Sequence, residues 1–365
     1  MVRWLLIAMM LVALPLVGIV VAGRDTTPYL AFPPLTRYVP QAGFSWTWFA
    51  FFAIVDGLAM AALLWAVRQG LRNRNVTFAG PVTGNRFPWW GWLALLVCLF
   101  FWVMAWTRFT WFRAFQQHTF LPLWVGLIFT VNALAVKRSG GCLMLRNPAA
   151  FLLLFPVSAV FWWFFEYFNR FVQNWYYTGV QGLGPVEYSY LSSIAFATVL
   201  PGVLSMIDLL LTVPALNDGL AHGRRLDLPT SRWVPRGVLA LAAAGLMLIG
   251  VFPDQLFALL WVSPLLIIVC VQALAGRPTL LSPLRRGDWR PVVTPAIAAL
   301  ICGFFWEMWN FFSLARWSYT VPYVQRFHLF EMPILGYGGY LPFGLTCLAM
   351  GTLVVGDLFA ARSPA

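Results

Sequence analysis

Glutamate is scarce in this sequence, and its four residues occur as a repeated pair. Glu166 lies in FWWFFEYFNRFVQNWYY (161–177) and Glu307 in FFWEMWNFFSLARWSY (304–319). Both segments contain an aromatic cluster, then Glu, two residues, Asn and a following Trp-x-Tyr. The other two glutamates of the chain, Glu187 and Glu331, follow one copy each. The pattern indicates an internal repeat that places carboxylates at equivalent positions.

The spacing between Glu and Asn predicts a side-chain pair in each copy. Residues i and i+3 share one helical face, so Glu166 with Asn169 and Glu307 with Asn310 are expected to form carboxylate–amide dyads in which the amide donates to the carboxylate. Such a group suits general acid catalysis, proton exchange or cation coordination. The alternative is that these polar residues only join helices by hydrogen bonds. Arg170 is either a counter-ion or an interfacial arginine.

Aromatic residues surround both glutamates and are candidates for lining a substrate cavity. Their faces stabilise cations and pack well against rings and isoprenoid chains, whereas the alternative is anchoring at the membrane interface. The candidates are Trp162, Trp163, Trp175, Tyr177, Trp306, Trp309, Trp317 and Tyr319, together with Asp56 in the middle of an apolar run. Asp208 is expected to be solvated near a membrane interface.

Metal and cofactor chemistry finds little support in the pattern. His118 and His328, with Glu187 and Glu331, are weak candidates for zinc or iron ligands, but no HExxH or clustered histidine pattern is present. The glycines do not form a phosphate-binding or dinucleotide-binding fingerprint. The prediction is therefore no metal and no cofactor.

The composition requires a surface that faces lipid. Hydrophobic residues make up 61% of the 365 residues and charged residues 10%, whereas soluble domains carry about 25% charged residues. The five scattered cysteines are expected to be buried small hydrophobes. The net charge of +12 is explained by basic loops, so lipid headgroups are expected partners and nucleic acid is not.

Ten apolar runs are long enough to cross or nearly cross a bilayer. They predict an all-α polytopic transmembrane helix bundle, and the sixth and tenth runs are long enough to tilt or break. The runs are 4–22, 45–67, 89–107, 119–136, 150–172, 188–213, 237–252, 255–274, 291–314 and 336–358.

Basic residues predict the orientation of this bundle. Loops after even-numbered spans hold fifteen of the 24 Lys and Arg, and loops after odd-numbered spans hold seven. This excess places the even loops and both termini in the cytoplasm. The first span is expected to be retained, although it could be a cleaved signal.

The repeated segments are separated by an even number of spans, which makes the repeat parallel. Spans 3–6 (89–214) and 7–10 (237–358) are the predicted repeats of four spans, and 1–75 is a two-span addition to one integrated membrane domain. Both glutamate pairs then fall in the outer half of the membrane or at its outer face.

Several elements resemble an uncharacterised family of bacterial polytopic inner-membrane proteins. They are the two Glu-x-x-Asn segments, GRPTLLSPLRRGDWRP (276–291) and FEMPILGYGGYLPFG (330–344). The resemblance implies the bacterial inner membrane and supplies no activity. Relatives carry a glutamate just after the Leu-Pro-Phe element, where this chain has Thr346. The glycines of 336–344 predict a re-entrant turn or a broken helix start beside Glu331.

Three functions remain open from the sequence. The first is a membrane-embedded enzyme in which a Glu general acid acts on a lipid-soluble substrate of isoprenoid or lipid type. The second is a proton- or cation-coupled carrier with a small-molecule substrate. The third is a structural or assembly subunit whose dyads only hold helices together. The oligomeric state is left open.

Overall fold

Apolar helices build almost the whole molecule, and the predicted all-α polytopic bundle is confirmed. The computed structural model describes residues 2–360 apart from 35–36, 74–84, 181 and 230. Within this part of the chain, eight helical segments are long and apolar enough to cross a membrane. They are α1 (Val2–Val21), α3 (Trp46–Asn73), α4 (Trp89–Trp106), α5 (Phe120–Ser139), α7 (Pro148–Val172), α8–α9 (Pro185–Phe196 and Val199–Leu210), α14 (Arg290–Phe311) and η3–α15 (Ile334–Gly339 and Tyr340–Val355).

The seventh predicted span has its expected length but begins earlier, at Trp233, and the eighth is four residues shorter than expected. They correspond to α11 (Trp233–Leu248) and α13 (Leu259–Leu274), each of 16 residues. At 1.5 Å per residue such a helix is about 24 Å long, less than the roughly 30 Å of a hydrocarbon core. The short helix α12 (Pro253–Leu256) joins them.

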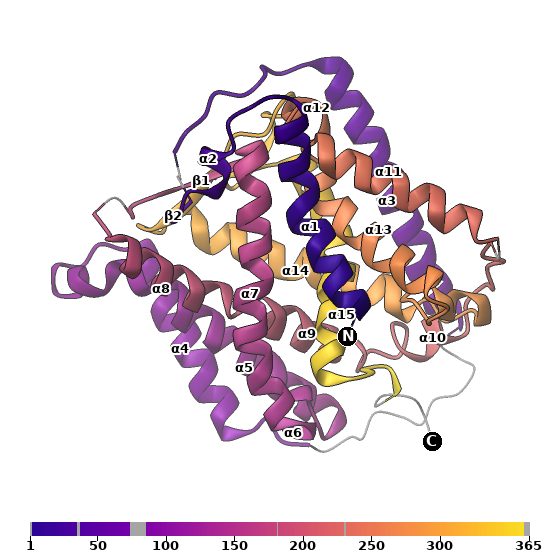
Figure 1. The fold of residues 1–365 in the computed structure, drawn as a ribbon. Helices are drawn as coiled ribbons and strands as arrows, with labels where there is room; N and C mark the ends of the chain where they lie inside the picture. The colour runs from indigo at the N-terminus through magenta and orange to yellow at the C-terminus, as the bar shows by residue number, and fades with distance from the viewer. Residues whose placement is uncertain (1, 35–36, 74–84, 181, 230, 361–365) are drawn as a thin grey trace.

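Short elements connect the long helices and form most of the two ends. They are α2 (Thr27–Leu30), η1 (Thr110–His118), α6 (Leu143–Arg146), α10 (Asp218–Ala221), η2 (Ser282–Arg286) and the strands β1 (Trp175–Thr178), β2 (Arg316–Tyr319), β3 (His328–Leu329) and β4 (Met332–Pro333). Figure 1 shows β1 and β2 at one end of the bundle, which we call the ladder end. The opposite end, where α1 begins and α15 finishes, is the terminus end.

The described parts of the basic loops meet at the terminus end. Asn73 donates to the carbonyl of His222 at 2.9 Å, and the N–H of Gly223 donates to the carbonyl of Gly287 at 2.8 Å. Asp208, expected to be solvated, is instead fully buried and forms an ion pair with Arg146. The reason is that Arg146 supplies a counter-charge, which lets a carboxylate enter the protein interior.

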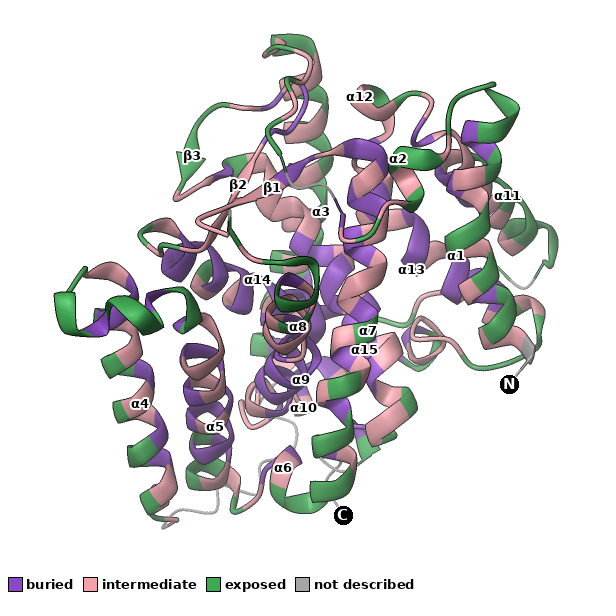
Figure 2. Cartoon of the chain, turned by 60° about the vertical axis from the view of Figure 1, so that its left-hand side comes forward, coloured by how far each residue is buried: buried purple, intermediate pink, exposed green. Residues whose placement is uncertain are grey.

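The bundle is built around α9, on which every residue from 199 to 208 is buried. Figure 2 shows this buried colour continuing onto α5 and α14, whereas α4 presents exposed residues outward. Between α8 and α9 the helix breaks at Ala197 and Thr198, as the length of the sixth predicted span suggested. Ser158 of α7 donates to the carbonyl of Phe196 at 2.6 Å and accepts from the N–H of Leu200 at 2.9 Å. The hydroxyl therefore satisfies the backbone groups that the break exposes.

The strands β1 and β2 form an antiparallel ladder directly after the two glutamate-bearing helices. Trp175 pairs with Tyr319, and Tyr177 pairs with Trp317. The tryptophan of each Trp-x-Tyr motif thus lies opposite the tyrosine of the other. This register is the one that a local two-fold axis through the ladder would produce, although the division into repeats stays a prediction.

Candidate functional site

A cavity lined mainly by aromatic side chains lies beside the β1–β2 ladder. The cavity volume is about 180 Å³. Its walls come from α5, α7, α8, α9, α13, α14, α15, both strands of the ladder and β4, with further residues from η1 and η3. Its aromatic lining residues are Phe120, Trp162, Trp175, Tyr177, Tyr188, Phe196, Trp261, Trp306, Trp317, Tyr319, Tyr340 and Phe343.

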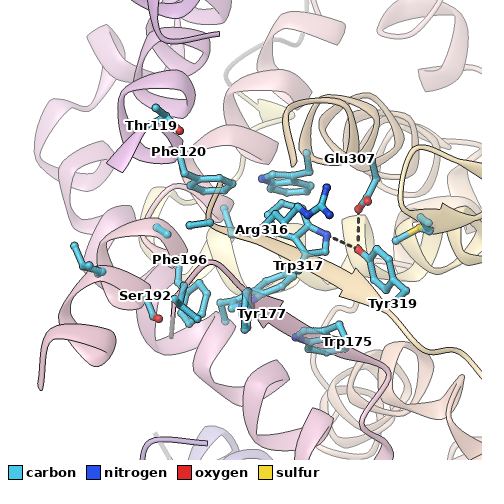
Figure 3. A pocket seen from close by; sticks show the side chains of 18 of the residues that line it. Thr119, Phe120, Trp175, Tyr177, Ser192, Phe196, Glu307, Arg316, Trp317 and Tyr319 are labelled. Carbon is cyan, nitrogen blue, oxygen red and sulfur yellow. Dashed lines mark hydrogen bonds between the residues drawn. The ribbon is translucent and has the colours of Figure 1, made fainter. Parts of the chain in front are cut away.

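Glu307 contributes to this wall and is completely buried. Its Oε1 accepts hydrogen bonds from the hydroxyls of Tyr319 at 2.7 Å and Tyr340 at 2.9 Å. Trp317 Nε1 donates in turn to the hydroxyl of Tyr319 at 2.9 Å, and Figure 3 shows this chain of three side chains. Glu307 Oε2 is buried without a hydrogen-bond partner among the described residues. One oxygen of this carboxyl group is therefore fully engaged and the other is not.

Glu166 has a different set of partners. Its Oε1 accepts from Trp162 Nε1 at 3.1 Å, from Trp175 Nε1 at 3.1 Å and from the Tyr177 hydroxyl at 2.6 Å. These three donors line the cavity, whereas Glu166 lies behind them. The two glutamates are thus related in sequence, but Glu307 is the one in the cavity wall.

The predicted carboxylate–amide dyads are corrected by the structure. Asn169 Nδ2 donates to the carbonyl of Trp175 at 2.8 Å, and Asn310 Nδ2 donates to the carbonyl of Trp317 at 2.7 Å. Each asparagine also accepts from the backbone N–H of the same strand residue, at 3.3 and 2.8 Å. The helices end just before the strands, and the strands' first backbone groups need partners. The asparagine side chains therefore bind the backbone of the ladder and not the glutamate side chains.

The two ladder tyrosines are permanent hydrogen-bond donors at physiological pH. Burial, and next the charge of the adjacent glutamate, raises the pKa of Tyr177 and of Tyr319 well above the ordinary value of 10.0. Both phenols are on strands outside the membrane-spanning helices. The hydrogen bonds to Glu166 and Glu307 therefore persist across the physiological range.

Six of the nine predicted lining residues do line the cavity, and three do not. Trp163 points elsewhere and donates to Ser193 Oγ at 3.0 Å, because consecutive helical residues differ by about 100°. Trp309 packs edge-on against Trp124 instead. Asp56 lies against Gly338, on η3, and is partly buried. These three predictions are corrected.

The remaining candidate ligands are not brought together. Glu187, His118 and His328 are exposed, and Glu331 Oε1 lies 3.5 Å from Arg316 Nη1. No group of three or more His, Cys, Asp or Glu side chains forms a possible metal site in the described part of the chain. Arg170 Nη1 donates to the carbonyl of Tyr29 at 2.7 Å, so it ties the segment before α3 to α7.

Sequence reasoning missed several cavity residues, above all Tyr340 and Trp261. Tyr340 is the first residue of α15, directly after the glycine-rich turn η3, and this place at a predicted broken helix start was an available signal. Trp261 lies in a uniformly apolar helix, so no spacing distinguishes it from a packing residue. Thr346 is buried and donates to the carbonyl of Pro342 at 2.9 Å.

Comparison of the chain with protein-family models, with curated protein sequences and with solved structures gives no match.

Proposed function

We propose that this integral membrane protein is an enzyme that binds a lipid-soluble substrate in the aromatic cavity and protonates it with Glu307. One observation carries the proposal. Glu307 is fully buried in the cavity wall, with two phenols bound to Oε1 and no partner for Oε2 in the described structure. A buried carboxyl group held in this way is typical of a functional acid in a membrane protein.

The hydrogen bonds indicate where the proton of a neutral Glu307 resides. Oε1 already accepts two phenol protons, so the carboxyl proton belongs on Oε2. In the proposed step the O–H bond breaks, and the π electron pair of a carbon–carbon double bond forms a new C–H bond. The adjacent carbon becomes positively charged beside aromatic rings. Loss of a proton from a neighbouring carbon to the carboxylate yields an isomer and restores the acid.

A comparison of cellular lipids tests this function. In a strain that lacks the gene, one lipid-soluble species should accumulate and another should disappear. Wild-type protein and Asp227→Asn, which removes an exposed carboxylate at the terminus end, should restore the pattern. Glu307→Gln should be present in the membrane at normal abundance and should not restore it. Restoration by Glu307→Gln would show that Glu307 is not the acid.

A proton-coupled carrier is the second candidate. The ladder joins the two predicted repeats beside the cavity, and such an interface is where carriers commonly bind their substrates. Proteoliposomes distinguish the two functions, because a carrier gives a flux that depends on the pH gradient and leaves the transported molecule chemically unchanged. If Glu166→Gln and Glu307→Gln both retain full activity, the glutamates are scaffolding.

We also propose an orientation with the ladder end outward and both termini in the cytoplasm of a bacterium. The basic loops support it, because their described parts lie together at the terminus end. A reporter domain that is active only in the cytoplasm should be active when it is fused after the last residue. A reporter domain that is active only outside the cytoplasm should be inactive in the same fusion. The opposite result would invert the topology.

A further inference from the structure

We propose that the aromatic cavity recognises positive charge, so that its ligand is a lipophilic molecule with a cationic centre. The centre is either an ammonium group or the cation that forms when Glu307 protonates a double bond. The inference deepens the proposed function and rests on it only for the second case. It is carried by the direction of the polar atoms in the cavity wall and by the balance of charge there.

The polar atoms of six lining aromatic residues are already bound to the protein. The donors to Glu166 are Trp162, Trp175 and Tyr177. The donors to Glu307 are Tyr319 and Tyr340, and Trp317 donates to the hydroxyl of Tyr319. The two glutamates therefore draw indole N–H and phenol O–H groups to themselves. What these six rings leave for a ligand is their faces and C–H edges, which offer no N–H or O–H donor to an anion; the Tyr188 hydroxyl, also in the wall, lies outside this set.

The faces of the rings are held in place by one another. Trp306 stacks with Tyr340 at 6.1 Å between ring centroids, and Trp175 packs against Trp261 at 5.8 Å. Phe343 is in edge contact with Trp261 and stands at 6.2 Å from Trp306. An aromatic face carries partial negative charge, and a cation close to it is attracted. A preformed wall of such faces attracts a cation without first paying to order its own side chains.

The charge in the wall also favours a cation once Glu307 has given up its proton, because the carboxylate is then negative. Glu307 forms no ion pair in the described structure. Arg316 is the arginine among the lining residues, and its guanidinium is compensated by Glu331 Oε1 at 3.5 Å and by the carbonyl of Phe311 at 2.8 Å. The cavity therefore combines one uncompensated carboxyl group with many ring faces. This is the chemistry that recognises quaternary ammonium groups elsewhere.

Two probes of the same shape separate charge from size. Benzyltrimethylammonium and neopentylbenzene differ in having nitrogen or carbon at the branched centre, and phenylacetate supplies an anion. Binding to the full-length protein in lipid nanodiscs is measured by saturation-transfer NMR competition. We expect the cation to bind at least tenfold more tightly than neopentylbenzene, which is about 1.4 kcal/mol, and phenylacetate to bind most weakly.

Variants show whether this preference belongs to the cavity. Glu307→Gln should reduce the affinity for the cation at least tenfold and leave neopentylbenzene unchanged. Trp306→Leu should reduce cation affinity by removing a ring face, and Asp227→Asn should change neither probe. Equal affinities for the two isosteric probes, or a preference that survives both cavity variants, would overturn the inference. The lipid comparison with Glu307→Gln judges the proposed enzyme separately, so either idea can fail while the other stands.

Discussion

Gly303 allows a direct test of how the fold positions Glu307. Gly303 lies one helical turn before Glu307 on α14, and the ring of Tyr340 rests on it. A methyl group added at Gly303 would lie 2.4 Å from Cε2 of Tyr340 and 2.6 Å from two further ring atoms. Carbon atoms normally approach to about 3.5–4.0 Å. Gly303→Ala must therefore move the tyrosine ring, and its hydroxyl leaves Glu307 Oε1.

The expected cost follows from three contributions. Overpacking costs about 1–3 kcal/mol, and a buried acceptor that loses a donor costs about 1–3 kcal/mol. Alanine is favoured over glycine in a helix by about 1 kcal/mol, which offsets part of this. The net loss in the free energy of unfolding is about 3 kcal/mol, or a fall of roughly 4 °C in the unfolding midpoint of a chain of this length.

The assay uses the cysteines of the chain. All five are free and buried, so a thiol-reactive fluorescent dye reports unfolding of the purified protein. Gly57→Ala is the matched control, because no atom lies within 4 Å of a methyl group at that position on α3. It should leave the midpoint unchanged or raise it slightly, since the same propensity term acts without a clash.

A double variant shows whether the effect passes through Tyr340. Tyr340→Leu removes the ring that the new methyl group would strike. Gly303→Ala should then cost at least 1 kcal/mol less in the Tyr340→Leu background than alone. The reasoning is refuted if Gly303→Ala is as stable as wild type, or if the two changes are additive.

Three further outcomes are expected. Asn310→Ala removes partners from two backbone groups of β2 and should lower the free energy of unfolding by about 2–3 kcal/mol, seen as a lower midpoint in the dye assay. The folded protein holds the proton of Tyr319 more tightly than the unfolded chain, so its contribution to stability is constant below pH 10 and declines as the pH rises above 10. Midpoints measured from pH 8 to 11 should therefore fall less steeply in Tyr319→Phe, and exposed Tyr190→Phe should behave like wild type. Asp208→Ala removes the buried acceptor of the Leu143 N–H and the ion-pair partner of the solvent-accessible Arg146 and should cost about 1–3 kcal/mol; an unchanged midpoint would contradict this role.

Local pattern was sufficient to find the glutamates and several of their neighbours. The repeated Glu-x-x-Asn and Trp-x-Tyr motifs predicted residues that the structure places around one cavity, such as Tyr177, Tyr319 and Trp317. The partners of Asn169 and Asn310 could not be predicted in the same way. Helical spacing brings Glu and Asn to one face, but it does not show that the chain turns into a strand whose backbone groups compete for the amide.

The sequence by itself determined the class of protein, because a chain with 10% charged residues can bury its apolar surface only in lipid. It also determined that basic residues concentrate in every second loop. Successive spans run in opposite directions, so these loops lie at the same end of the bundle. The tertiary structure alone decided which glutamate reaches the cavity. Glu166 and Glu307 have nearly the same local sequence and each accepts its side-chain hydrogen bonds on Oε1, yet of the two it is Glu307 that lies in the cavity wall. That difference arises from contacts such as Tyr340 with Glu307, which join residues 33 positions apart and have no periodic signal.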